Sequence, residues 1–134
     1  MEYFTIKEFV SRKMFENNSE EELWKLLDPK LLKTISWLRE RLGPMRINTW
    51  ASGGDLEQRG YRGKDCTIGA VHSAHKEGKA LDFDVKGMTS EQVRQWIELH
   101  QEELPYPIRY EDRVTWCHID TREVKDDRAY EFQP

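Results

Sequence analysis

The most informative segment of this chain is SAHKEGKALD, residues 73–82. Six residues separate His75 from Asp82, and Gly78 lies between them. A glycine permits a tight turn there, and the small Ala80 lets backbone or a ligand approach closely. Because the residues that follow alternate in polarity, the stretch predicts a turn that leads into a strand carrying Asp82.

A second histidine, His118, lies in the stretch TWCHID, residues 115–120, which predicts a buried strand. A buried imidazole needs a partner for each ring nitrogen. With His75 and Asp82 it would complete three ligands, and three protein ligands with an open fourth position are typical of catalytic zinc. Such a site polarises a carbonyl and makes bound water more acidic. The spacing by itself arises easily by chance, so the alternative is a set of histidines that bind no metal.

The pattern Ser-x-His-x-x-Gly-x-Ala-x-Asp resembles the signature of the zinc D-Ala-D-Ala carboxypeptidases and of the related cell-wall endopeptidases of phage endolysins. The matching residues are Ser73, His75, Gly78, Ala80 and Asp82. The similarity continues, in the family's order, at residues 4–9 (FTIKEF), 38–39 (LR), 46–49 (RINT) and 116–120 (WCHID). It therefore covers most of the chain.

This resemblance implies that His75, Asp82 and His118 bind Zn²⁺. It also implies the small α+β fold of these peptidases, called hedgehog/DD-peptidase-like, with the metal on a central antiparallel sheet. The implied activity is that of a hydrolase, a zinc carboxypeptidase or endopeptidase that cuts peptidoglycan stem peptides.

Hydrolysis of an amide by zinc-bound water requires a general base, for which Glu111, Asp112 and Asp120 are the candidates. Many members of the family carry a glutamate three residues before the last histidine, where this chain has Thr115. We expect Glu111 to be the base, and Asp120 to be a base or a support for His118. The alternative is that Glu111 is solvated and Asp120 is paired with an arginine.

The segment Arg59-Gly-Tyr-Arg62 resembles the arginine-bearing loop of the same family. We expect Arg62 to bind the substrate carboxylate or to stabilise the oxyanion, and Arg59 is the second candidate for this role. Ser73 is expected to hydrogen-bond substrate or a ligand. Arginines in loops are more often simply solvated, which is the alternative for both.

The remaining patterns predict one α+β domain over residues 1–134, with helices first and strands later. Capping residues predict short helices after Thr5 and Ser19 and longer ones after Asp28 and Thr89. Alternation predicts strands at residues 46–50, 80–85, 108–110, 114–119 and 129–132. The glycine-rich residues 51–70 predict a functional loop at the rim of the site.

Composition narrows the range of partners. The net charge of -4 comes from 21 basic and 25 acidic residues without a basic run, so we expect no nucleic acid and no membrane as partner. The two cysteines, Cys66 and Cys117, form no CxxC pair, which argues against a disulfide framework and a thiolate zinc site. Cys117 should point away from the site into the core, because it precedes His118 on an alternating strand.

The start of the chain, MEYFTIKEF, lacks the basic residues and apolar stretch of a signal peptide. We expect a monomer that is synthesised in the cytoplasm and has peptidoglycan peptide as its substrate. By analogy with the family, it would be released to the cell wall during phage lysis, and the alternative is a cytoplasmic dipeptidase. A second alternative belongs to a different class of function: a metal-binding or structural phage-related domain of the same fold without catalysis. Thr115, which stands where many members of the family have a glutamate, is the reason for this alternative.

Overall fold

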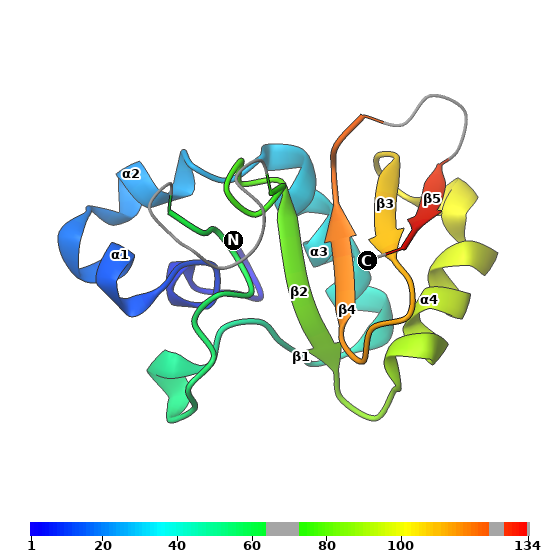
Figure 1. Ribbon diagram of the computed structural model, residues 1–134, viewed down its shortest axis with the longest axis horizontal. Helices are drawn as coiled ribbons and strands as arrows, with labels where there is room; N and C mark the ends of the chain where they lie inside the picture. Colours follow the sequence, from blue (N-terminus) through cyan, green and yellow to red (C-terminus); the bar gives the residue numbers. More distant parts are fainter. Residues whose placement is uncertain (64–72, 124–127, 134) are drawn as a thin grey trace.

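Capping residues set the helices in the N-terminal third of the chain (Figure 1). The computed structural model describes residues 1–63, 73–123 and 128–133. A 3-10 helix, Ile6–Glu8, precedes α1 (Arg12–Asn17), α2 (Glu20–Trp24) and the longer α3 (Pro29–Leu42). The side chains of Ser19 and Asp28 accept hydrogen bonds from the first backbone N–H groups of α2 and α3. These bonds satisfy amides that have no partner within the helix.

Five short strands form one sheet in the order β1-β2-β4-β3-β5. They are β1 (Met45–Arg46), β2 (Ala80–Val85), β3 (Ile108–Glu111), β4 (Cys117–Asp120) and β5 (Ala129–Phe132). β5 runs parallel to β3, and the other neighbouring pairs are antiparallel. The predicted α+β class, with N-terminal helices before a mostly antiparallel sheet, is confirmed.

The sheet separates an apolar core from a polar face. Two helices, α3 and α4 (Ser90–Leu99), pack against the sheet, and a 3-10 helix, Gln101–Glu103, follows α4 (Figure 1). Phe83 and Ile119 are buried in the core, and Cys117 lies there too, as predicted. The alternate positions, Asp82 and His118, are direct partners across β2 and β4 and therefore share the opposite face.

The strand predicted at residues 46–50 is confined to β1 because the chain turns to bond the N-terminal segment. The backbone N–H of Asn48 donates to the carbonyl of Glu8 at 3.1 Å, and its side-chain amide donates to the carbonyl of Val10 at 3.0 Å. The backbone N–H of Asn48 is therefore not available for pairing with a neighbouring strand, and a 3-10 helix, Trp50–Ser52, follows.

The strand predicted at residues 114–119 begins only at Cys117, because a buried arginine binds the preceding carbonyls. The guanidinium of Arg94, on α4, donates to the carbonyl oxygens of Val114 and Trp116 at 3.1 and 3.4 Å. The connection between β3 and β4 is consequently held by α4 rather than by strand pairing.

Gly78 makes the turn before β2 possible, as the sequence predicted. Its φ is +72°, in the left-handed region, and its carbonyl accepts the backbone N–H of Asp28 at 2.9 Å. A Cβ added to Gly78 would collide with the carbonyl oxygen of Leu26. Only glycine satisfies both the backbone angle and the close approach.

We expect Gly78→Ala to lower the free energy of unfolding by about 2–4 kcal/mol, because angle strain and a backbone collision add. Gly87→Ala is the matched control, since Gly87 also has a positive φ, +81°, but an added Cβ meets no described atom within 4 Å. That control should lose only about 1–2 kcal/mol. Urea unfolding measures both, and equal losses would contradict the close approach at Gly78.

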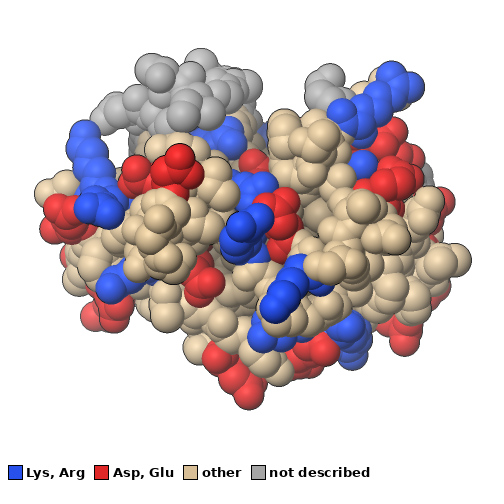
Figure 2. Space-filling model, turned by 90° about the horizontal axis from the view of Figure 1, so that it is seen from below, with Lys and Arg blue, Asp and Glu red and all other residues tan. Residues whose placement is uncertain are grey.

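The surface carries charges of both signs without a large patch of either on the face seen in Figure 2, where acidic and basic side chains are interspersed with neutral ones. Within the described ranges, no helix has both the length and the apolar character needed to cross a membrane.

Candidate metal centre

Two histidines and an aspartate meet on the polar face of the sheet. Asp82, in β2, lies opposite His118, in β4, and His75 comes from the turn that Gly78 closes. Asp82 Oδ1 lies 2.7 Å from His118 Nδ1 and 3.3 Å from His75 Nε2. One ligand atom from each residue lies within 4.8 Å of the others, and all three residues are buried. The three predicted ligands are therefore assembled into a group that could hold a metal ion.

Outer hydrogen bonds orient both imidazoles. His75 Nδ1 lies 2.9 Å from the carbonyl oxygen of Gly60, to which only a protonated nitrogen can donate. This contact leaves Nε2 of the neutral ring bare and directed at Asp82. His118 Nε2 lies 3.0 Å from Asp120 Oδ2, which leaves Nδ1 for the metal in the same way. Such outer partners fix the tautomer and raise the basicity of metal-binding histidines.

The donor set fits Zn²⁺. Two imidazoles and one carboxylate are ordinary zinc ligands, and three of them leave a position open for water or substrate. Neighbouring ligand atoms in a tetrahedral zinc site lie about 3.3 Å apart, which is the separation found between His75 Nε2 and Asp82 Oδ1, 3.3 Å. The shorter distance from Asp82 to His118, 2.7 Å, is that of a hydrogen bond whose proton the metal would replace.

Asp120 contacts His118 at Nε2, the ring nitrogen that does not face Asp82. The carboxylate is fully buried, and the guanidinium of Arg109 binds it in bidentate fashion, with Nε 2.8 Å from Oδ1 and Nη2 3.0 Å from Oδ2. The ring of Phe132 lies 4.3 Å from that guanidinium and 5.5 Å from the His118 ring. Since Arg109 and His118 already occupy its oxygens, the geometry favours the supporting role over that of a base for Asp120.

The group opens into a cavity of about 310 Å³. The cavity is lined by Arg62, Ser73, Ala74, His75, Asp82, Arg109, Glu111, Trp116, His118, Asp120, Arg122 and Phe132. It thus gathers the predicted metal ligands together with Glu111, Asp120, Arg62 and Ser73. The roles proposed for those four residues in catalysis and substrate binding stay predictions.

The two candidate arginines lie in different places. Arg62 Nη2 is 3.5 Å from Asp82 Oδ2, and Arg62 Nε donates to the carbonyl of Gln58 at 2.9 Å, so its guanidinium stands beside the triad. Arg59 is not among the cavity's lining residues, and its guanidinium binds both oxygens of Asp84, at 2.8 and 3.2 Å. Of the predicted loop, residues 64–70 lie outside the described part of the chain, as does Cys66.

The residues of the site to which the sequence analysis gave no role include Gly60, Arg109, Arg122 and Phe132. Arg109 lies in the strand predicted at residues 108–110, and the structure extends this strand to Glu111, which places both side chains on one face. Gly60 acts through its carbonyl oxygen, which leaves no trace in side-chain patterns. Phe132 reaches the site only because β5 pairs in parallel with β3, a pairing that the sequence did not indicate.

The metal-free triad holds a proton between two carboxylates. Burial alone would lower the pKa of His118, but its hydrogen bonds with Asp120 and Asp82 outweigh burial and raise that pKa to about 9. Burial alone would raise the pKa of Asp82, yet hydrogen bonds with His118 and His75 bring it well below its usual range. The pKa of Asp120 is lowered because the bonds with His118 and Arg109 outweigh burial.

We expect the metal-free protein to be most stable between about pH 4 and 6.5. The raised pKa of His118 gives a stabilisation that is complete below its unfolded value and is lost as the pH rises through about 9. The lowered pKa values of Asp82 and Asp120 give one that is lost as the pH falls below about 4.

Urea unfolding of chelator-treated protein from pH 4 to 10 measures this dependence. The free energy of unfolding should fall by an amount on the order of 2 kcal/mol between pH 6.5 and 9.5. The His118→Ala variant is the control and should lack that alkaline decline. A free energy of unfolding that does not change with pH in the unsubstituted chain would count against the raised pKa of His118.

Comparisons with known proteins find no relative of this chain. The chain matches no protein-family model, no curated protein and no solved structure. The family resemblance of the signature around His75 therefore stays a prediction, and function has to be inferred from the site. What the site offers is a buried group of two imidazoles and one carboxylate that could hold a metal ion.

Proposed function

We propose that this protein is a zinc-dependent peptidase that hydrolyses peptide bonds of bacterial peptidoglycan. One observation carries the proposal: the ligand atoms of His75, Asp82 and His118 lie within 4.8 Å of one another. They do so in a cavity that also contains the carboxylate Glu111 and the guanidinium of Arg62. A metal position, a base and a cation in one cavity are the components that amide hydrolysis requires.

When bound, zinc would supply Lewis acidity that polarises the scissile carbonyl and acidifies a water molecule. Glu111 would accept a proton from the attacking water as the water oxygen adds to the carbonyl carbon. It then passes the proton to the amide nitrogen as the C–N bond breaks. Arg62 stabilises the negative charge that develops on the carbonyl oxygen. Asp120 keeps Nε2 of His118 protonated and the ring in place.

The substrate class rests on the signature formed by residues 73–82, which resembles that of the zinc D-Ala-D-Ala carboxypeptidases and endolysin endopeptidases. Thr115 stands where many of them have a glutamate. We assign the role of general base to Glu111 instead of that glutamate. Glu111 ends β3, which pairs with the strand that carries His118, and it lines the same cavity.

Metal analysis and a peptidoglycan assay test the proposal together. Purified protein should contain about one zinc per chain and release free D-alanine or new amino groups from purified peptidoglycan. A chelator should abolish the release, and added zinc should restore it. Bound zinc without hydrolysis would support a metal-binding domain without catalysis instead, and no zinc, even after incubation with it, would refute the peptidase.

A further inference from the structure

The edge strand β5 brings an aromatic side chain, Phe132, to the metal cavity (Figure 1). The backbone N–H groups of Ile108 and Asp112, at the two ends of β3, donate to the carbonyls of Arg128 and Phe132 at 2.9 and 2.8 Å. Both ends of β5 are therefore fixed to β3. Neither Phe132 nor Arg109 is a ligand, base or oxyanion donor in the proposed hydrolysis, yet both line the cavity.

An unbroken series of contacts joins β5 to the metal position. The ring centre of Phe132 lies 4.3 Å from the guanidinium of Arg109. That guanidinium binds both oxygens of Asp120, at 2.8 and 3.0 Å. Asp120 Oδ2 lies 3.0 Å from Nε2 of His118, and Nδ1 of the same ring faces Asp82. A strand that contributes no metal ligand thus contacts the metal centre through its side chains.

The shape of the guanidinium matters for this series of contacts. Arginine presents its N–H donors in a rigid planar fork, so its two parallel hydrogen bonds fix the plane of the Asp120 carboxylate as well as its position. With that plane fixed, Oδ2 stays directed at Nε2 of His118. A lysine at position 109 would carry the same charge but make a point contact, which leaves the carboxylate free to rotate.

Burial makes Asp120 dependent on Arg109. The Asp120 side chain is fully buried, and its further described contact is a longer hydrogen bond from the backbone N–H of Arg122, at 3.3 Å. A buried carboxylate that loses its cation is costly, so it would turn or move toward water. His118 would then lose the acceptor that orients its ring. Phe132 covers the guanidinium of Arg109, which keeps it on the carboxylate.

We propose that Arg109 is a positioning residue of the metal centre, which acts through Asp120 to orient His118, and that β5 holds Arg109 in place through Phe132. The inference rests on the metal-binding part of the proposed function. It extends the metal centre from its three ligands to the edge of the sheet, so zinc affinity should depend on a strand that contributes no ligand.

Competition with a chromophoric chelator measures the zinc affinity of substituted chains. Arg109→Met removes the fork and should weaken zinc binding about 10–100-fold, the usual effect of losing an outer partner of a metal-binding histidine. Arg109→Lys should recover part of this loss, because it keeps the charge beside the carboxylate. Phe132→Ala should weaken zinc binding about two- to fivefold, the size of a cation–π contact.

Arg59→Met is the matched control. Arg59 binds both oxygens of Asp84, at 2.8 and 3.2 Å, and its side chain is 15% exposed, compared with 23% for Arg109. Asp84 lies on the same face of β2 as Asp82 but does not line the metal cavity. Arg59→Met should therefore lower the urea midpoint as Arg109→Met does, yet leave zinc affinity unchanged.

Urea midpoints establish which variants fold, and Arg109→Lys and Phe132→Ala decide the question if Arg109→Met does not. The visible spectrum of the Co²⁺-loaded protein reports the geometry of the ligands. Substitution of Arg109 should change that spectrum, and Arg59→Met should not. Zinc affinity that is unchanged in the Arg109 variants, or that falls equally in Arg59→Met, would overturn the positioning role.

Hydrogen exchange tests the part played by β5. The N–H groups of Ile108 and Asp112 exchange with solvent when β5 separates from β3, since they donate to its carbonyls. Coupling between two sites acts equally in both directions, so saturating zinc should slow their exchange about two- to fivefold. This effect should disappear in Arg109→Met. Exchange that zinc does not slow in the unsubstituted protein would refute the role of β5.

Hydrolysis of peptidoglycan peptides is scored separately in the same samples. Zinc affinities in the predicted order without hydrolysis by any chain would count against the peptidase and support the positioning role. Hydrolysis by a zinc protein whose affinity ignores Arg109 would do the reverse. An unsubstituted chain that binds no zinc would overturn both.

Discussion

Replacing His118 with alanine is expected to weaken zinc binding by at least about a thousandfold, and His75→Ala should do the same. Each substitution removes one of three protein ligands, and two ligands do not hold zinc against water and buffer. The loss at His118 should be compounded by the carboxylates of Asp82 and Asp120, which would lose the imidazole that lies between them, 2.7 and 3.0 Å away. Elemental analysis after dialysis, and competition with a chromophoric chelator, measure the affinity.

His100→Ala is the matched control for these variants. His100 follows α4, stacks on Trp96 at 4.0 Å between ring centres, and does not line the metal cavity. Its replacement should therefore leave one zinc per chain. If His75→Ala and His118→Ala retained zinc at the level of His100→Ala, the metal would lie elsewhere and the site proposed here would be wrong.

The metal ligands were predicted from the resemblance of residues 73–82 to a zinc-peptidase signature, because their spacing alone arises easily by chance. Gly78 produces a turn that brings His75 back to the start of β2, and a strand that begins at Ala80 puts Asp82 on one face. Pairing β2 with the strand that holds His118 then completes the triad. The turn and the alternation follow from a turn residue and a period of two, whereas the pairing of β2 with β4 does not.

Asp120 was predicted as a base or a support for His118, with pairing to an arginine as an alternative, but which arginine binds it depends on strand register. Arg109 reaches Asp120 because these two residues are direct partners across β3 and β4. A shift of one residue would turn Arg109 to the other face. The sequence predicted both strands but misplaced the start of β4, since carbonyls before Cys117 bond Arg94 instead of a neighbouring strand.

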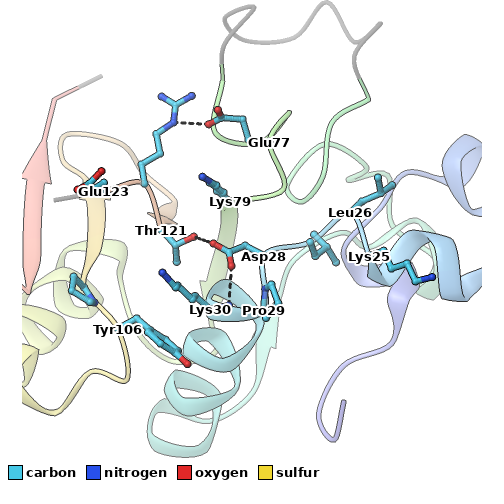
Figure 3. A pocket seen from close by; sticks show the side chains of 13 residues that line it. Lys25, Leu26, Asp28, Pro29, Lys30, Glu77, Lys79, Tyr106, Thr121 and Glu123 are labelled. Carbon is cyan, nitrogen blue, oxygen red and sulfur yellow. Dashed lines mark hydrogen bonds and ion pairs between the residues drawn. The ribbon is translucent and has the colours of Figure 1, made fainter.

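A cavity of about 680 Å³ at the start of α3 (Figure 3) could not be predicted from the sequence for a related reason. Its walls meet because Thr121, after β4, donates a hydrogen bond to Asp28, the N-cap of α3, across 93 positions of sequence. The capping role of Asp28 was evident from the proline that follows it. Its second oxygen, which carries the tertiary contact, has no signature in the order of residues.

Glu111→Gln is expected to lower kcat for peptidoglycan peptides by about 10²–10⁴-fold while one zinc per chain remains bound. The amide has nearly the shape of the carboxylate but cannot accept a proton from water. Glu111 is also not one of the three metal-binding residues, His75, Asp82 and His118. Activity and metal content should therefore separate, which they cannot do when a ligand is removed.

Asp112→Asn provides the comparison, because it makes the same change of carboxylate to amide at the neighbouring position. Asp112 lies 3.8 Å from the guanidinium of Arg94 and does not line the metal cavity, so its replacement should leave kcat nearly unchanged. Rates measured with saturating peptide, alongside zinc content, distinguish the two variants. Full activity in Glu111→Gln would exclude Glu111 as the base and, since Asp120 is held by Arg109 and His118, would require a base from outside the described lining of the cavity.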